Sequence, residues 1–122
     1  MAKKVLVVDD SPTVRQQVGI VLREAGYEVV EAEHGLEGKH KIETQPDLSM
    51  VICDVNMPHM NGIELVAAVS GNYPNLPIVM LTTEGHPDLV MRAKKAGAKG
   101  WLVKPFKPAL LVATIAKLAG AA

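Results

Sequence analysis

Four short apolar runs most constrain what this chain can fold into. They read VLVV, MVIC, IVML and WLV and cover residues 5–8, 50–53, 78–81 and 101–103. Each run is too short for a helix, and it lacks the alternation of a strand that has one face in water. Continuous apolar strands are typical of parallel sheets buried on both faces. A more polar segment, YEVVEAE at residues 27–33, is predicted as a strand nearer the sheet edge.

Helical segments separate these strands. Ser11 and Pro12 indicate a helix start, with Ser as the N-cap and Pro preset at the first helical position, and Gly26 is expected to end this helix. Further helices are predicted over about residues 36–44, from about 62, over 87–96, and from 108. Strands and helices therefore alternate as (βα)5, which predicts one doubly wound α/β sandwich with right-handed crossovers.

The composition narrows the class of protein. The chain has 122 residues, 48% of them hydrophobic, which suits one globular domain with a real core. A formal net charge of +0 argues against nucleic-acid binding, which needs a basic excess. The single Cys, Cys53, excludes an internal disulfide and a Cys-based zinc site, and it fits a cytoplasmic protein. No apolar run approaches the ~20 residues of a membrane span.

Polar residues that can carry chemistry follow the predicted central strands. In chain order these residues are Asp9 with Asp10, Asp54, Thr82 with Thr83, and Lys104. Because the carboxyl ends of parallel strands share one edge of the sheet, these side chains are expected to converge there. Clustered carboxylates repel one another and suit a hard cation such as Mg²⁺. Together with a lysine and a hydroxyl, they are the parts of a phosphoryl-transfer site.

Asp54 is the candidate to receive a phosphoryl group. The sequence has no Walker loop and no GxGxxG motif, so it does not predict a bound nucleotide. An aspartate is then left as the acceptor, and Asp54 is single, central and followed by the irregular loop VNMPHMNG. For Asp10 alone, a role in a turn or as a helix cap explains the residue about as well as a role in the site, since it precedes a helix start.

Four segments, VLVVDDS, DVNMPHMNGIEL, IVMLTTE and GAKGWLVKPF, resemble the receiver domain of bacterial two-component response regulators. Among these, the chain looks most like the single-domain, CheY-like chemotaxis type. The resemblance covers nearly the whole chain, so residues 1–122 are expected to form one receiver domain with no output domain. It implies a flavodoxin-like sheet with strand order 2-1-3-4-5, which is the order known for CheY.

The resemblance also implies roles for the site residues. Asp54 would accept a phosphoryl group from a phosphohistidine of a sensor histidine kinase, and Lys104 would pair with a phosphoryl oxygen. Mg²⁺ would be bound by Asp10, Asp54 and the backbone carbonyl of Asn56. Asp9 would act on the metal through water, although which of Asp9 and Asp10 is the direct ligand stays open. The peptide between Lys104 and the following proline is expected to be cis.

A switch is implied as well. The Thr82 hydroxyl would turn toward the phosphoryl group, and Trp101, where the family usually has Tyr or Phe, would then move inward. The face of the fourth helix, fifth strand and fifth helix would change and bind a target protein, such as a flagellar motor switch component. Asn56 and Glu84 would tune the phosphoryl group, which is expected to be short-lived. The protein would catalyse only its own phosphorylation and dephosphorylation. It is expected to be a monomer, and a phosphatase is a possible further partner.

Other functions remain open at this stage. The chain could be a phosphorelay intermediate or a phosphate sink, which the sequence does not separate from a switch. An aspartyl-phosphate phosphatase would need a second acid at position 56, where this chain has Asn56. From Arg92 onward the chain carries Lys and Arg but no Asp or Glu. This basic segment is either a solvated face with counter-charges elsewhere in the fold or a surface for an acidic partner.

Overall fold

Strands and helices alternate strictly in the computed structural model, which describes residues 3–121. The strands are β1 (Lys4–Val8), β2 (Glu28–Ala32), β3 (Leu48–Cys53), β4 (Ile78–Thr82) and β5 (Gly100–Val103). The helices are α1 (Pro12–Glu24), α2 (Gly35–Thr44), α3 (Gly62–Val69), α4 (Pro87–Ala96) and α5 (Pro108–Ala119). The predicted (βα)5 order is confirmed.

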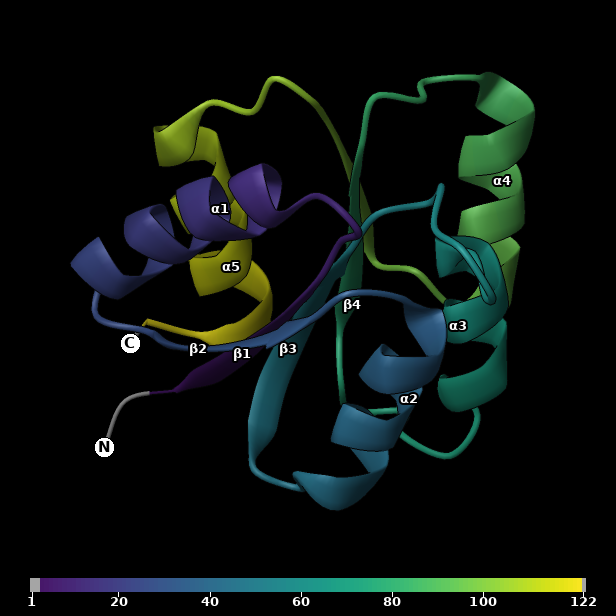
Figure 1. The fold of residues 1–122 in the computed structure, drawn as a ribbon, viewed down its shortest axis with the longest axis horizontal. Coiled ribbons are helices and arrows are strands. Elements are labelled where there is room, and N and C mark those ends of the chain that lie inside the picture. Colours follow the sequence, from purple (N-terminus) through teal and green to yellow (C-terminus); the bar gives the residue numbers. More distant parts are fainter. Residues whose placement is uncertain (1–2, 122) are drawn as a thin grey trace.

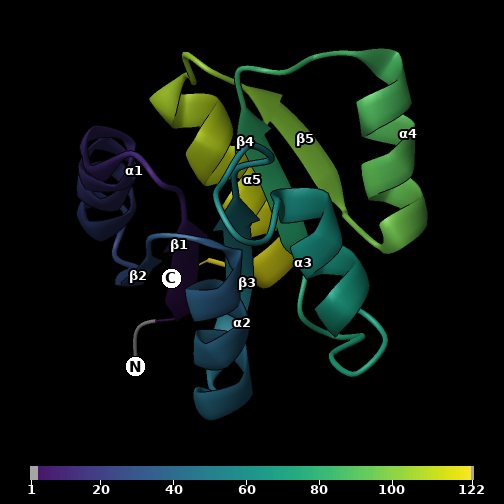
Figure 2. The same cartoon turned by 45° about the vertical axis from the view of Figure 1, so that its right-hand side comes forward.

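The five strands form one parallel sheet in the order β2-β1-β3-β4-β5. The chain moves from β1 outward to β2 and then returns to the other side of β1 to form β3, so the strand order reverses between β1 and β3. Helices α1 and α5 cover one face of the sheet, and α2, α3 and α4 cover the other (Figures 1 and 2). This is the flavodoxin-like fold predicted from the sequence.

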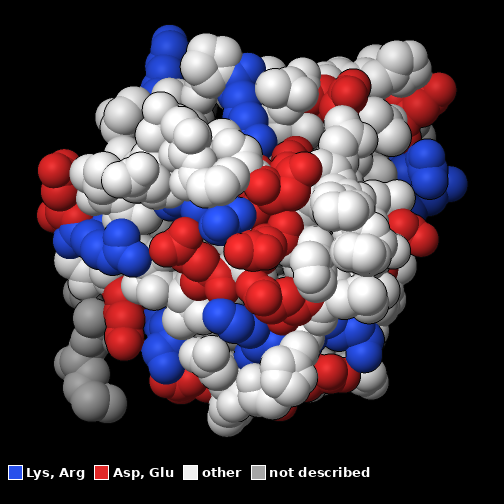
Figure 3. Space-filling view, viewed as in Figure 1, with Lys and Arg blue, Asp and Glu red and all other residues white. Residues whose placement is uncertain are grey.

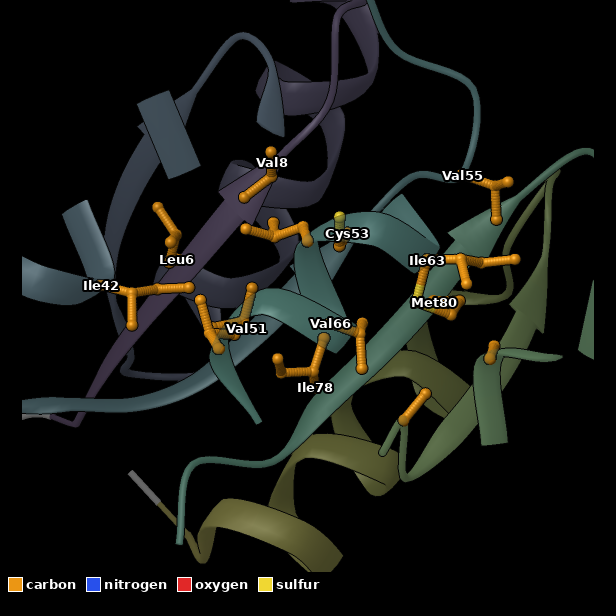
Figure 4. Close-up of a cluster of buried hydrophobic side chains, with 14 of the residues drawn as sticks. Leu6, Val8, Ile42, Val51, Cys53, Val55, Ile63, Val66, Ile78 and Met80 are labelled. Atoms are coloured by element: carbon orange, nitrogen blue, oxygen red, sulfur yellow. The ribbon is translucent and has the colours of Figure 1, made fainter. Parts of the chain in front are cut away.

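Alternate residues of the central strands point to opposite faces of the sheet and build two cores. Val5 and Val7 of β1 pack toward α1 and α5, in a cluster that also contains Leu22. Leu6 and Val8 pack toward α2, α3 and α4 in a second cluster, which Figure 4 shows. All these side chains are at most 1% exposed. The uninterrupted apolar runs in the sequence arise because both faces of these strands are covered.

The edges of the sheet differ from its centre. Strand β2 is mostly half-buried, as its more polar sequence predicted. Strand β3 begins at Leu48, two residues before the apolar run at residues 50–53. Leu48 pairs with Lys4 of β1, and the half-buried Ser49 follows it. The apolar pattern marks only the fully covered part of this strand, because hydrogen bonds extend it into a region where a polar side chain is tolerated.

Side chains cap most of the helices. The Ser11 hydroxyl accepts a hydrogen bond from the backbone of α1, as predicted, and Asn61 forms a reciprocal capping box with Glu64 at the start of α3. His34 caps α2 and His86 caps α4, each accepting a backbone N–H at Nδ1. The sequence does not predict these two caps, because histidine is not a preferred N-cap residue. Among the described residues, none of the helices combines the length and apolar character needed to cross a membrane.

Candidate functional site

Three carboxylates meet at the carboxyl edge of the sheet, where the strand order reverses. Asp9 and Asp10 follow β1, and Asp54 follows the neighbouring β3. One oxygen from each carboxylate lies within 4.8 Å of the others, a spacing that could hold a metal ion. Asp9 is 3% exposed and Asp54 is 8% exposed, whereas Asp10 faces solvent. The predicted convergence of these three residues is confirmed, and the oxygen-only donor set fits Mg²⁺.

Both carboxylate oxygens of Asp9 have protein partners. Oδ1 accepts the backbone N–H of Ser11 at 2.9 Å, and Oδ2 accepts a hydrogen bond from Lys104 Nζ at 2.7 Å. The backbone N–H of Asp9 donates to the carbonyl of Ala32 at the end of β2, at 3.1 Å. Asp9 is therefore fixed by contacts with three separate segments of the chain.

Lys104 reaches the site from the loop after β5. Its Nζ lies 2.7 Å from Asp9 Oδ2 and 3.4 Å from Asp54 Oδ2. Burial lowers the pKa of Lys104, but the hydrogen bond to Asp9 and the charges of Asp54 and Asp9 outweigh it and raise the pKa above its ordinary value. Lys104 is therefore an ammonium ion at neutral pH. The peptide bond between Lys104 and Pro105 is cis, as predicted.

Asp54 lies where β3 gives way to the loop before α3. Its Oδ1 accepts the backbone N–H of Val55 at 2.7 Å, and its own N–H donates to the carbonyl of Val8 at 2.9 Å. Gly62 packs directly against this backbone, because a Cβ at that position would lie 2.0 Å from the Asp54 carbonyl oxygen. The glycine of the quoted motif therefore lets α3 begin in contact with Asp54.

The Asp10 carboxylate has a different surrounding from the other two. A helix cap was one explanation of this residue, but Ser11 is the N-cap of α1, and its hydroxyl accepts the N–H of Val14 at 3.3 Å. The N–H of Ser11 is bonded by Asp9 rather than by Asp10. Within residues 3–121, no side chain pairs with the Asp10 carboxylate, so its oxygens are free to bind a ligand at the mouth of the site.

Glu84 forms hydrogen bonds with three other predicted residues, Asn56, Thr82 and Trp101. Its carboxylate accepts a hydrogen bond from Asn56 Nδ2 at 3.1 Å, its N–H donates to the hydroxyl of Thr82 at 3.2 Å, and its carbonyl accepts from Trp101 Nε1 at 2.9 Å. Thr82 is fully buried and Trp101 is half-buried against the core below α4. Thr83 is exposed and lines a groove beside Lys104 instead. The sequence did not indicate that one residue contacts all three of these side chains.

Charge is unevenly distributed over the surface. Acidic side chains gather toward the middle of the face shown in Figure 3. Of the cations from residue 92 onward, only Lys104 forms an ion pair within the described part of the chain. The others are exposed, namely Arg92, Lys94, Lys95, Lys99, Lys107 and Lys117. Since no counter-charge pairs with them, these cations give α4, α5 and the loops on either side of β5 an unpaired, solvent-facing basic surface.

A five-stranded 2-1-3-4-5 sheet with an acidic cluster and a lysine at its carboxyl edge defines a CheY-like receiver domain. The chain belongs to the response regulator receiver domain family, which matches residues 5–116.

Individual relatives agree with this assignment. The chemotaxis protein CheY1 of Helicobacter pylori is 46% identical over 111 residues, which cover 88% of this chain and 90% of the relative. The solved structure of the Vibrio cholerae chemotaxis protein CheY4 superposes with a TM-score of 0.90 at 45% identity and covers 97% of this chain and 99% of that one. A CheX–CheY–BeF3–Mg²⁺ complex from Borrelia burgdorferi matches with a TM-score of 0.90 at 27% identity, over 94% of this chain and 87% of that chain.

Proposed function

We propose that this protein is a signalling switch that accepts a phosphoryl group on Asp54 from the phosphohistidine of a sensor kinase. The observation that carries the proposal is the buried Asp54 carboxylate with one oxygen held by a backbone N–H and the other 3.4 Å from Lys104. A carboxylate oxygen of Asp54 attacks the phosphorus atom as the P–N bond of the phosphohistidine breaks. The bonding electron pair stays on the imidazole nitrogen, and an acyl phosphate forms on Asp54.

The acidic cluster is suited to Mg²⁺, held by Asp10, Asp54 and the carbonyl of Asn56. When bound, such a cation neutralises the negative charge that the carboxylates and the transferred phosphoryl group share. Asp10 is proposed as a direct ligand and Asp9 as one that acts through water, because both Asp9 oxygens already accept hydrogen bonds from the protein. The Borrelia CheY relative was solved in a complex that contains Mg²⁺ and BeF3, which supports the choice of Mg²⁺ as the metal.

Lys104 and Thr82 are proposed to recognise the phosphoryl group. Lys104 needs to shift little to bond a phosphoryl oxygen on Asp54, given its present distance of 3.4 Å. Thr82 would exchange its contact with the Glu84 N–H for one with the phosphoryl group. The indole N–H of Trp101 donates a hydrogen bond to the backbone carbonyl of the same Glu84, so a movement of Glu84 would change the hydrogen bond that holds the indole. This links the site to the face formed by α4, β5 and α5.

The output is proposed to be protein binding in chemotaxis or motility signalling, since the Helicobacter pylori relative CheY1 is a chemotaxis protein. The unpaired basic surface on α4 and α5 favours a target that is acidic, such as a component of the flagellar motor switch. The sensor kinase and a dephosphorylating partner complete the proposed set of partners, and the CheX-bound Borrelia relative supports the last of these. That the protein is a monomer and is located in the cytoplasm stays a prediction.

Trp101 provides the test, because it is the only tryptophan of the chain. The wild-type protein is titrated with Mg²⁺ and then with beryllofluoride, while its fluorescence is followed, and phosphorylation by a small phosphodonor is measured by mass. We expect a change in fluorescence with each addition and one added phosphoryl group. The control is Asp54→Asn, which should accept no phosphoryl group. An unchanged wild-type signal, or equal phosphorylation of Asp54→Asn, would overturn the proposal.

A further inference from the structure

The side chain of Arg15 lies behind the acidic pair, on the first turns of α1. Its Nη1 donates a hydrogen bond to the backbone carbonyl of Asp9 at 2.6 Å, and its Nε donates to Glu31 Oε1 of β2 at 3.2 Å. Only 11% of the Arg15 side chain is exposed. Helix α1 packs against the part of the sheet formed by β1 and β2 (Figure 1). Neither contact involves the reacting carboxylate Asp54.

The carbonyl that Arg15 binds belongs to the peptide between Asp9 and Asp10. A peptide unit is planar, so fixing the Asp9 carbonyl also fixes the direction of the N–Cα bond of Asp10. The other end of the Asp9 residue is held by its N–H, which donates to Ala32. Asp10 has no side-chain partner within the described chain, so its place beside Asp9 and Asp54 depends on this backbone alone.

The contribution of Arg15 is mainly geometric. Glu31 already offsets the guanidinium charge, so the pair adds little net positive charge to the acidic cluster. The two contacts point in different directions, which a planar guanidinium can satisfy simultaneously and a lysine ammonium cannot do with the same fixed geometry. Lys41 donates to the Glu31 carbonyl at 2.7 Å, so the strand that carries Glu31 is itself held in place.

We propose that Arg15 is a positioning residue for the metal site: by binding the Asp9 carbonyl from a Glu31-supported guanidinium, it holds Asp10 in the place where it can bind Mg²⁺. This inference rests on the proposed function. It extends the set of functional residues to a side chain that touches neither the metal ligands' carboxylates nor the phosphoacceptor.

The test compares three variants in the full chain: Arg15→Gln, Arg15→Lys and Arg23→Gln. Arg23 is the matched control, because it lies on the same helix and 3.9 Å from the same Glu31 but does not contact Asp9. Isothermal titration calorimetry measures the Mg²⁺ dissociation constant. Circular dichroism measures the melting temperature of the metal-free protein, and a small phosphodonor measures phosphorylation as a function of Mg²⁺ concentration.

We expect Arg15→Gln to weaken Mg²⁺ binding about tenfold, as is typical when a residue that orients a metal ligand is lost. Arg15→Lys should lie between Arg15→Gln and the wild type, and Arg23→Gln should stay within about twofold of the wild type. At saturating Mg²⁺, phosphorylation of Arg15→Gln should return to within about threefold of the wild-type rate, because Arg15 does not touch Asp54. A purely structural role would lower the melting temperature without this dependence on Mg²⁺.

Two results would overturn the inference while leaving the proposed function intact. One is wild-type Mg²⁺ affinity in Arg15→Gln, and the other is an equal loss in Arg23→Gln. If Arg15→Gln does not fold, the Mg²⁺ affinity of Arg15→Lys is used instead, since this variant keeps the charge and the aliphatic stem. Weaker Mg²⁺ binding by Arg15→Lys supports the inference, and wild-type affinity overturns it. Failure of the wild type itself to bind Mg²⁺ or to be phosphorylated would instead overturn the proposed function, and the inference with it.

Discussion

The Lys104 ammonium donates a hydrogen bond to Asp9 of the acidic pair Asp9 and Asp10 at 2.7 Å, so this lysine already has a carboxylate partner besides the phosphoacceptor. Its distance to Asp54 Oδ2 is 3.4 Å. The two members of the acidic pair are thereby made unequal. Asp9 has a cationic partner and is buried, whereas Asp10 is exposed and adds a further negative charge to a site that contains one lysine.

This inequality predicts opposite effects of two substitutions on the metal-free protein. Asp10→Ala should raise the free energy of unfolding, by about 1 kcal/mol, because it relieves repulsion in the cluster. Asp9→Ala should lower it by about 1–3 kcal/mol, because Lys104 and the Ser11 N–H lose a buried acceptor. Urea unfolding in the presence of a chelator measures both values. A clearly destabilised Asp10→Ala would show that Asp10 stabilises the turn instead.

The hydrogen bond between Asn56 and Glu84 predicts coupled effects on dephosphorylation. Asn56→Ala and Glu84→Ala should each slow the loss of the phosphoryl group several-fold, and the double variant should be little slower than either one, because both remove the same contact. Release of phosphate after phosphodonor removal measures the rates. The wild-type phosphoryl group is expected to be short-lived, and a group that persists for hours in Mg²⁺ buffer would contradict this. Strictly additive single effects would show that the two side chains act independently.

The close approach of Gly62 to Asp54 predicts a steric effect. Gly62→Ala places a methyl group 2.0 Å from the Asp54 carbonyl oxygen and 2.6 Å from Met80 Cε, and it should lower the free energy of unfolding by about 1–3 kcal/mol or more. Gly71→Ala is the control, since a Cβ there meets no atom within 4 Å. It should change stability by no more than about 0.5 kcal/mol. Urea unfolding of both variants checks the contrast, which equal stabilities would refute.

Tyr27 predicts a pH dependence at alkaline pH. Its hydroxyl donates to the Gly120 carbonyl at 2.8 Å, and burial raises the pKa of the phenol above its ordinary value of 10.0. Because folding raises the pKa of Tyr27, the contribution of the protonated phenol to the free energy of unfolding is fully present below pH 10.0. It is lost as the pH rises through the pKa of Tyr27 in the folded state. Tyr27→Phe should therefore be about 1 kcal/mol less stable at pH 7. The difference should shrink above pH 10.0, and urea unfolding from pH 7 to 11 measures it.

Much of the fold follows from local patterns. The four apolar runs predicted buried parallel strands, and Ser11 with Pro12 predicted the start of α1, because burial on both faces and helix capping leave their signal within a few adjacent residues. The boundaries were harder to predict. Strand β3 extends to Leu48 through hydrogen bonds with β1, and a strand extension of this kind depends on a partner elsewhere in the chain. The caps formed by His34 and His86 were missed because histidine is not a preferred N-cap residue.

The sequence by itself determined which residues meet at the site, since a parallel sheet places every strand's carboxyl end on one edge. Only the tertiary structure decided how they are paired there. Asp9 and Lys104 are 95 positions apart, and Trp101 reaches Glu84 across 17 positions, so neither contact leaves a local pattern in the sequence. The same holds for Arg15, whose two partners are the Asp9 carbonyl just after β1 and the Glu31 carboxylate of β2. Such contacts depend on ångström-scale distances between packed segments, which the order of apolar and polar residues does not specify.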